Sequence, residues 1–396
     1  MTGLDLATAD VVSDGRSVIP QGGVLSEGGV VLAWGPAQEL REKYPGARVH
    51  PQGVAITPPL ANAHTHLDLS HVPFLALPYF DWITGVVLPN NHLRTVQAAR
   101  DGLEQLGRAY TGAFGDIVYQ PGVMDLLLQE AEIPGIAYWE VLNPDPGQAD
   151  EVFAATVRRL ESWRRLERPG GVRVGLTPHT PFTVSSSLMG RLCEYAAGEG
   201  IPLQVHVAEH PAELELFRTG EGELARSLRT MTSVPLEATL GRRPDPALSP
   251  VRYLVELGVL EARPTLVHMV QVDEEDVRTV AQAGCGVVTC PRSNHNLDCG
   301  RFPFELYARQ GVVVGLGTDS AASGETLDIC SEALSALRLH AGHLERPALV
   351  QSLFMGSYQV LGLAPPELGP GAPVTDLVCW QDPAPPSGRP ADGLSA

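Results

Sequence analysis

The sequence predicts an α/β protein with a (β/α)8 barrel of the TIM type and a small flanking β-sandwich built from both ends of the chain. Between residues 58 and 364, apolar runs alternate with amphipathic stretches, which is typical of a parallel sheet whose strands are joined by helices. Eight such runs match the strand number of the barrel. The alternative is a doubly wound open sheet. No glycine-rich nucleotide-binding loop follows any run, and this favours the barrel.

The amino-terminal region, residues 1–57, is predicted to form the first part of the sandwich. Short apolar segments such as residues 28–35 are bounded by glycines, and runs bounded by turn residues are typical of hairpin strands. Residues 365–396 are predicted to supply the second part, because a turn-rich segment there leads into an apolar run that ends at Trp380. From Gln381 the chain is rich in proline, and we expect a loose tail.

The central region, residues 58–364, is predicted to form the barrel. The predicted strands cover residues 54–63, 113–120, 133–142, 172–178, 202–208, 264–270, 286–290 and 312–317. The predicted helices cover residues 93–109, 123–130, 150–166, 185–199, 273–283 and 326–340.

Composition and charge restrict the partners. The chain has 396 residues, of which 44% are hydrophobic and 19% charged, as in globular proteins. Its net charge of −18 argues against nucleic acid and against anionic membranes, because both are polyanions, so a small-molecule partner is expected. The amino terminus has no secretory pattern, no run is long and apolar enough to span a bilayer, and the six cysteines form no CxxC pair. We therefore expect a cytoplasmic protein.

Imidazole and carboxylate side chains follow the predicted strands. His64 and His66 end the first strand, and they point to one spot because alternate residues of a strand face the same side. Other strands end in side chains of the same kind, namely His179, His206 with Glu209, His268 and Asp319. Catalytic groups of a (β/α)8 barrel lie at the carboxyl ends of its strands, so the sequence predicts a site there.

Five stretches, in order and across nearly the whole chain, resemble the metal-dependent amidohydrolase superfamily. They are Asn62–His66, Gln204–Glu209, Thr265–His268, Cys290–Asn294 and Leu316–Ser320. The resemblance implies the barrel, the flanking sandwich and hydrolysis at a metal centre. Many members hold two metals bridged by a carbamylated lysine. Lys43 is the only lysine here and precedes the first barrel strand, so one metal ion per chain is expected.

The same resemblance assigns roles to individual residues. It implies that the metal ligands are His64, His66, His206 and Asp319. It also implies that Glu209 transfers protons and that His268 orients the attacking water. The His-x-x-Glu pattern of the fifth strand is characteristic of members that deaminate aromatic nitrogen heterocycles. Residues 176–185 resemble deaminases of adenine and guanine derivatives, in which the equivalent of His179 contacts the substrate.

The chemistry of these residues agrees with the assignment. Three neutral imidazoles and one carboxylate suit Zn²⁺ or Fe²⁺ and leave one coordination position for water, whose pKa the metal lowers to about 7. Asp319 can accept the proton of that water. A neutral Glu209 can protonate a ring nitrogen, which makes the amino-bearing carbon electrophilic, and ammonia then leaves.

Each of these residues also has an ordinary structural interpretation. His64 and His66 could be a structural pair, and Glu209 could be a helix-start carboxylate held by the helix dipole. His179 could be a hydrogen-bonded residue of the barrel interior, and Asp319 could belong to an Asx-type turn. The ordered set of ligand-type residues favours the functional interpretation.

The loop after the first strand narrows the substrate. Residues 62–70 and 80–83 resemble the aminodeoxyfutalosine deaminases of the alternative menaquinone pathway, in which a His-Thr-His-Leu-Glu-Leu-Ser run precedes Phe-x-x-Trp. Asp68 replaces the glutamate, and strand alternation should place it on the face of His64 and His66. We therefore expect hydrolytic deamination of an adenine nucleoside derivative, with 6-amino-6-deoxyfutalosine first among the candidates.

Other interpretations of the substrate stay open. The carboxylate of that substrate needs a cationic partner, for which Arg94 and Arg292 are the candidates, and Trp82 is a candidate cover that packing explains equally well. The alternatives are deamination of S-adenosylhomocysteine, methylthioadenosine or guanine, hydrolysis of a triazine, and a non-catalytic binding module. An intact ligand set with Glu209 argues against the last. A homodimer is expected because homo-oligomers are common.

Overall fold

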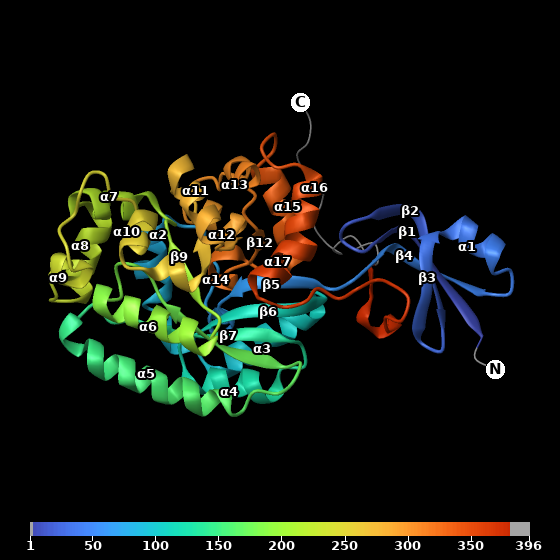
Figure 1. Ribbon diagram of the computed structural model, residues 1–396, viewed down its shortest axis with the longest axis horizontal. Helices are drawn as coiled ribbons and strands as arrows, with labels where there is room; N and C mark the ends of the chain where they lie inside the picture. The colour runs from blue at the N-terminus through green and yellow to red at the C-terminus, as the bar shows by residue number, and fades with distance from the viewer. Residues whose placement is uncertain (1–2, 381–396) are drawn as a thin grey trace. The chain divides into compact units, whose positions relative to one another are not determined.

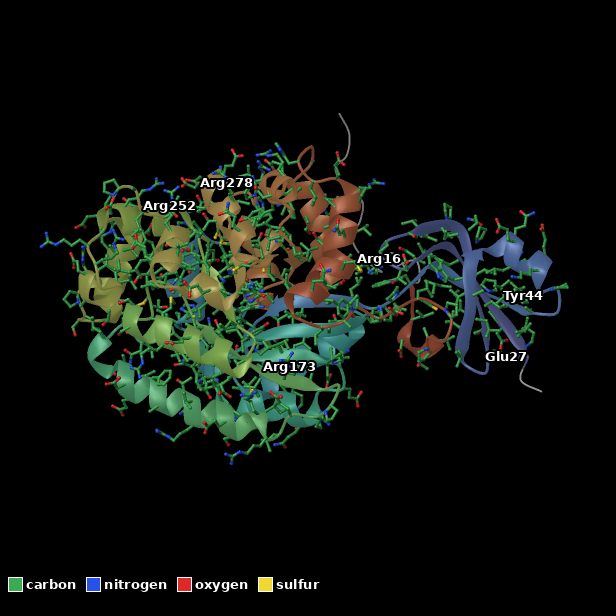
Figure 2. The ribbon with its side chains drawn as sticks, viewed as in Figure 1. Arg16, Glu27, Tyr44, Arg173, Arg252 and Arg278 are labelled. Atoms are coloured by element: carbon green, nitrogen blue, oxygen red, sulfur yellow. The ribbon has the colours of Figure 1, made fainter. Side chains whose placement is uncertain are left out.

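The computed structural model describes residues 3–380, and the predicted tail from Gln381 lies outside them. The chain divides into two compact units, which are residues 1–59 together with 365–396, and residues 60–364. Exposed charged side chains such as Arg16 and Glu27 in the first unit and Arg278 in the second point into solvent (Figure 2). Within the described range, no helix combines the length and the apolarity that crossing a bilayer requires.

The first unit contains a five-stranded sheet to which both ends of the chain contribute. Its order is β13-β4-β1-β2-β3. The elements are β1 (Leu4–Ser13), β2 (Val18–Glu27), β3 (Val30–Pro36), α1 (Ala37–Lys43), β4 (Arg48–Thr57) and β13 (Val378–Trp380). Val12 and Ile56 pack with Leu368 in one cluster, and Leu6 packs with Leu40 of α1 in another. The described residues therefore form one sheet, and the second layer of a sandwich stays a prediction.

The second unit contains eight parallel strands in two sheets of four, ordered β5-β6-β7-β8 and β12-β11-β10-β9. The strands are β5 (Leu60–Thr65), β6 (Thr111–Val118), β7 (Gly135–Val141), β8 (Val172–Pro178), β9 (Gln204–Val207), β10 (Thr265–His268), β11 (Val287–Thr289) and β12 (Val314–Leu316). Two isolated parallel bridges join the sheets, one between Leu176 and Leu203 and the other between Thr65 and Asp319. The α/β class with parallel pairing is thus confirmed.

Helices follow the strands, as the alternation predicted (Figure 1). Those that overlap predicted helices are α3 (Val96–Arg108), α4 (Pro121–Glu130), α5 (Ala149–Arg164), α6 (Ser186–Glu199), α11 (Glu274–Ala283) and α15 (Ile329–Leu339). The others are α2 (Tyr79–Trp82), α7 (Pro211–Thr219), α8 (Gly222–Met231), α9 (Leu236–Leu240), α10 (Pro250–Glu256), α12 (Pro291–Asn296), α13 (Phe304–Gln310), α14 (Ala321–Gly324), α16 (Arg346–Gln351) and α17 (Ser357–Val360). Helices α7 to α10 lie between β9 and β10 and share a core that includes Phe217 and Tyr253.

One predicted strand was wrong in its bounds. Residues 54–63 are the end of β4 and the start of β5, which belong to different units. Pro58 and Pro59 separate the two strands, because neither residue has an N–H group to donate to a ladder.

The two sheets share one hydrophobic core. Ala61 of β5 and Ile136 of β7 pack in the same cluster as Val267 of β10 and Val288 of β11. A core that spans both sheets fixes the strand ends relative to one another. The side chains that follow those ends are therefore held at defined positions.

Candidate metal centre and active site

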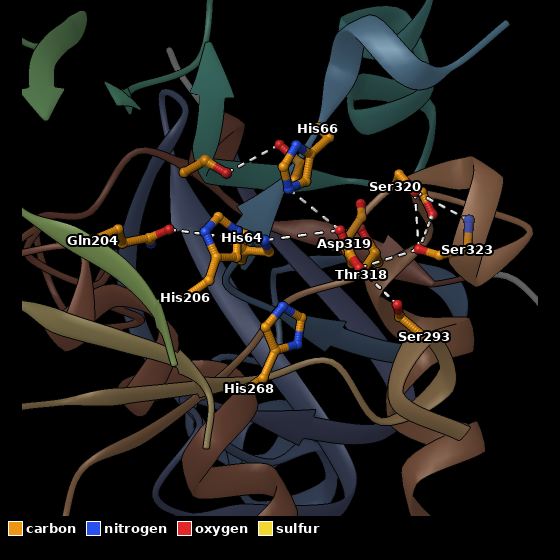
Figure 3. Close-up of polar contacts among 12 residues, drawn as sticks. His64, His66, Gln204, His206, His268, Ser293, Thr318, Asp319, Ser320 and Ser323 are labelled. Atoms are coloured by element: carbon orange, nitrogen blue, oxygen red, sulfur yellow. Dashed lines mark hydrogen bonds and ion pairs between the residues drawn. The ribbon is translucent and has the colours of Figure 1, made fainter. Parts of the chain in front are cut away.

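Three histidines from two strands converge at the carboxyl ends of β5 and β9. His64 lies in β5, His66 follows it directly, and His206 lies in β9; the ligand atoms of all three are within 4.8 Å of one another. Asp319, which follows β12, approaches with Oδ1 at 3.5 Å from Nε2 of His66 and 3.8 Å from Nε2 of His64 (Figure 3). The structure therefore brings together the four residues that the sequence assigned to a metal.

The surroundings of His64 leave one ring nitrogen free to bind a metal. Gln204 Oε1 lies 2.9 Å from Nδ1 of His64, and the Gln204 amide nitrogen donates to the Ala63 carbonyl oxygen at 2.8 Å. The amide oxygen therefore faces the ring, and Nδ1 carries the proton that it accepts. Nε2 of His64 is buried and has no hydrogen-bond partner among the described residues. Burial lowers the pKa of His64 to about 4, so the ring is neutral at pH 7.

Asp319 is held by hydroxyl groups on the side away from the histidines. Its Oδ2 accepts hydrogen bonds from Ser293 Oγ at 2.6 Å and Ser323 Oγ at 3.1 Å, which leaves Oδ1 toward the rings. Burial opposes ionisation, but the adjacent imidazoles and the Ser293 hydroxyl hold its pKa at about 2. Asp319 is therefore an anion at neutral pH. Together with the unpartnered nitrogen of His64, this donor set fits one divalent metal ion.

Glu209 lies beside this cluster and differs from Asp319 in its protonation state. Its side chain is buried, with Oε1 3.6 Å from Nε2 of His268 and 3.8 Å from the Cys299 thiol. Burial and the charge of Asp319 raise its pKa to about 8, although hydrogen bonds from Cys299 and Tyr79 lower it. The group is thus a neutral carboxylic acid at pH 7, which is the state that proton donation to a substrate requires.

Glu213, which the sequence analysis missed, fixes the backbone under Glu209. Its carboxylate accepts hydrogen bonds from the N–H groups of Ala208 and Glu209, both at 2.8 Å, and of His210 at 3.3 Å. The helix-start carboxylate is therefore Glu213 and not Glu209. Pro211 at the first position of α7 and Glu213 at the third were the signal in the sequence.

His268 is the last residue of β10 and is oriented from behind. Its Nδ1 lies 2.9 Å from Asn294 Oδ1, and its ring stacks on that of His206 with 5.6 Å between centroids. Because Nδ1 donates to the amide oxygen, Nε2 is left facing Glu209. Asn294 belongs to the fourth stretch of the resemblance, but the sequence analysis gave it no role.

The strand ends that carry these residues adopt backbone conformations that are rare outside glycine. Ala208 has a φ of 53°, His268 of 71°, Met269 of 49° and Asp319 of 58°. Such left-handed conformations cost about 1 to 3 kcal/mol each and persist where the surroundings enforce them, which is common at functional sites. Their concentration around the histidine cluster marks this edge as specialised.

His179 lies next to the cluster, together with a carboxylate that the sequence analysis missed. The His179 ring is 5.2 Å from that of His206, and its Nε2 is 3.8 Å from Oε1 of Glu140. Burial lowers the pKa of His179 to about 4 and raises that of Glu140 to about 7. Glu140 is the only charged residue of β7 and stands near its carboxyl end, which is the signal that could have identified it.

Asp68 does not share the strand face of His64, and that prediction was wrong. β5 ends at Thr65, and residues Leu67–Leu69 form a 3₁₀ turn, because Asp116 on β6 accepts the N–H of Leu67 at 2.8 Å. Asp68 is instead paired with Arg94, whose Nε and Nη2 both lie 2.9 Å from Asp68 Oδ2.

The remaining two candidates lie in packing networks. Trp82 donates from Nε1 to the Ala322 carbonyl oxygen at 3.0 Å and packs with Leu69 and Leu297. Arg292 donates to the Gly324 carbonyl oxygen and to two serine hydroxyls, and its Nε lies 3.4 Å from the buried Glu332. The interactions described for these two side chains are with residues outside the histidine cluster.

Comparison with known proteins gives a consistent result. A family model described as "Amidohydrolase family" matches residues 55–357. The aminodeoxyfutalosine deaminase of Deinococcus radiodurans is 52% identical over 378 residues, which are 95% of this chain and 90% of that protein.

Two solved structures share the fold. Aminofutalosine deaminase of Helicobacter pylori, in complex with methylthio-coformycin, has a TM-score of 0.76 at 19% identity and covers 93% of this chain and 90% of its own. An adenosine deaminase from Xanthomonas campestris with bound zinc has a TM-score of 0.70 at 24% identity, with coverages of 94% and 84%. At these identities, both likenesses concern the fold.

Proposed function

The chain belongs to the amidohydrolase family, and on that premise we propose that it is a metal-dependent hydrolytic deaminase of an adenine nucleoside derivative, with 6-amino-6-deoxyfutalosine as the first candidate. The resemblance found in the sequence is thereby confirmed at the level of the family. The observation that carries the proposal is the position of the Glu209 carboxyl, which is buried beside the histidine cluster with Oε1 3.6 Å from Nε2 of His268. The similarity to the deaminase of Deinococcus radiodurans supports the choice of substrate, which belongs to menaquinone biosynthesis.

We propose His64, His66, His206 and Asp319 as the ligands of one divalent ion, Zn²⁺ or Fe²⁺. The unpartnered Nε2 of His64 supports this assignment, and the zinc-bound structural relative makes zinc the first ion to test. When bound, the metal supplies a water of lowered pKa and thus a nucleophile at neutral pH.

The residues of the chain then have separate tasks. Glu209 donates its proton to a ring nitrogen of the substrate and so makes the amino-bearing carbon electrophilic. His268 orients the attacking water through Nε2. Asp319, an anion at neutral pH, accepts one proton of that water and passes it to the leaving amine. The proton of the added hydroxyl returns to Glu209 as the carbonyl forms and ammonia departs, so both residues regain their starting states. His179 contacts the heterocycle from the neighbouring strand end.

The substrate candidates differ in what is attached to the heterocycle, so turnover separates them. Purified protein with measured metal content should release ammonia from aminodeoxyfutalosine, S-adenosylhomocysteine, methylthioadenosine, adenosine or guanine. We expect the first at a kcat/KM within the usual range of about 10⁴ to 10⁸ M⁻¹s⁻¹. The Glu209→Gln variant should bind the metal and lose the activity.

Two other outcomes are informative. If another of these substrates is deaminated faster, the proposed mechanism stands and the assignment to menaquinone biosynthesis fails. No ammonia from any of them, with one metal bound per chain, overturns the proposal and favours triazine hydrolysis or a binding module.

We also propose that the eight parallel strands close into a (β/α)8 barrel, which the bridges Leu176–Leu203 and Thr65–Asp319 support. The domain division 1–57, 58–364 and 365–396 and the terminal sandwich are proposed with it. The net charge of −18 supports a small-molecule substrate and argues against nucleic acid and anionic membranes as partners. A cytoplasmic location is proposed as well, because the six cysteines form no CxxC pair. A homodimer is the proposed assembly.

A further inference from the structure

Glu140 has a buried carboxylate that the reaction described above does not use. It lies near the carboxyl end of β7 with 8% of its surface exposed. Among the described residues, its one close polar contact is Nε2 of His179 at 3.8 Å, which is beyond hydrogen-bonding distance. With no donor among the described residues, hydrogen bonds to this carboxylate must come from water or from a ligand.

The charged neighbours of Glu140 already have partners. Arg94 is held by Asp68, with Nε and Nη2 both 2.9 Å from Oδ2, and Asp68 follows β5. The carboxyl groups of Asp68 and Glu140 thus lie near one guanidinium, whose described ion pair is with Asp68. A neutral hydrogen-bond donor therefore fits beside Glu140 better than an anionic group, which the carboxylates would repel.

Glu140 also lies at a suitable place for the part of a nucleoside that does not react. Its ligand atom is within 4.8 Å of those of His179 and His206, and His206 belongs to the proposed metal centre. The amino group and the sugar are attached to different rings of a purine. A nucleoside whose amino-bearing carbon lies at the metal centre therefore carries its sugar away from it, past His179.

We propose that Glu140 accepts hydrogen bonds from the sugar hydroxyls of the substrate and thereby selects ribonucleosides over deoxyribonucleosides. This inference rests on the proposed function and deepens it. A carboxylate has two acceptor oxygens, and two adjacent hydroxyls can each donate to one of them. Each hydroxyl that donates to Glu140 adds one hydrogen bond, so removal of a hydroxyl should give a measurable loss.

The competing occupant is a second metal ion held by Glu140, His179 and His206. The contacts of His206 argue against a second metal ion. Its Nδ1 lies 3.2 Å from the His179 carbonyl oxygen, and its other nitrogen is the proposed ligand of the first metal. One imidazole nitrogen binds one ion. A metal count on the variant separates the two interpretations.

The test compares adenosine with 2′-deoxyadenosine and 3′-deoxyadenosine on the metal-loaded wild type and on Glu140→Gln. We expect the wild type to lose about tenfold or more in kcat/KM when a hydroxyl is removed. In the variant this ratio should fall to within about threefold of one. Glu161→Gln, at an exposed position on α5, is the matched control and should keep the wild-type ratio.

A binding measurement makes the test independent of turnover. Calorimetry with inosine and 2′-deoxyinosine should give the same preference in the wild type and its loss in Glu140→Gln. Equal affinities in the wild type, an unchanged ratio in the variant, or loss of one metal per chain in the variant each overturn the inference. If the wild type deaminates no adenine nucleoside, the proposed function fails, and the calorimetric comparison still decides the role of Glu140.

Discussion

The side-chain oxygen of Gln204 lies 2.9 Å from Nδ1 of His64, and this contact joins β9 to β5 directly behind the proposed metal centre. A partner of this kind fixes the tautomer of a metal-binding histidine and the direction of its free nitrogen. We expect Gln204→Leu to weaken metal affinity about 10- to 100-fold with little change in fold. Chelator competition measures the affinity. Gln97→Leu, on the exposed face of α3, is the control, and equal affinities in the two variants would contradict the role of Gln204.

The raised pKa of Glu209 predicts the basic limb of the pH profile. Its pKa of about 8 lies above its ordinary value of 4.5, so the protonated form persists through neutral pH and is lost as the pH rises through 8. If this form donates the proton, kcat/KM should be sustained below pH 8 and fall above it. A profile from pH 6 to pH 10 measures this fall. A flat profile over that range would remove Glu209 from the role of general acid.

The close approach of Gly317 to His64 predicts a position that tolerates no side chain. A Cβ atom at Gly317 would lie 2.7 Å from the Cβ of His64 and 2.9 Å from its backbone nitrogen and oxygen. We expect Gly317→Ala to push β12 away from β5, to lower the melting temperature and to release metal. Gly107→Ala in α3 has nothing within 4 Å and should be neutral or stabilising. A Gly317→Ala protein with wild-type stability and metal content would show that the strands can move apart without harm.

The ion pair between Asp68 and Arg94 predicts that removal of the Arg94 side chain destabilises the protein. Asp68 is fully buried, so Arg94→Ala leaves a buried carboxylate uncompensated and should cost about 3 to 5 kcal/mol in the free energy of unfolding. Urea denaturation measures the change. Arg108→Ala, which breaks an exposed pair with Glu104, should cost at most about 0.5 kcal/mol. If both variants lose the same small amount of unfolding free energy, the buried pair stabilises the protein no more than the exposed pair does.

A further measurement on Arg94 tests one of the substrate contacts predicted from the sequence. Arg94 was a candidate partner for a substrate carboxylate, yet it already forms an ion pair with Asp68. An unchanged KM in a stabilised Arg94→Met protein would exclude that contact.

Local spacing explains which parts of the site were predictable. His64 and His66 meet because residues two apart in a strand face the same side, and their rings lie 5.0 Å apart. His206, His268 and Asp319 were found because the ends of parallel strands meet at one edge. Asp68 was misplaced because the strand ends at Thr65, where Asp116 on the neighbouring strand captures the backbone of the next turn.

The supporting residues were not predictable, because each acts on a partner that is distant in the sequence. Gln204 contacts His64 from another sheet, and Asn294 reaches His268 from a helix after the next strand. Glu140 carried a signal in the sequence, because it is the one charged residue of a buried strand. Its contacts could not be predicted, because they depend on where the neighbouring strands lie. Helices α7 to α10 were missed since glycines such as Gly220 and Gly241 divide them into short pieces.

The contact between the first and last strands of the second unit has a consequence for how the protein matures. The N–H group of Asp319 donates to the His64 carbonyl oxygen at 3.0 Å, so one proposed ligand is set by a strand made early and another by a strand made last. A nascent chain that has left the ribosome only as far as β11 carries the three histidines without the carboxylate. If these four residues are the ligands, high-affinity metal binding waits until β12 has been made and lies beside β5.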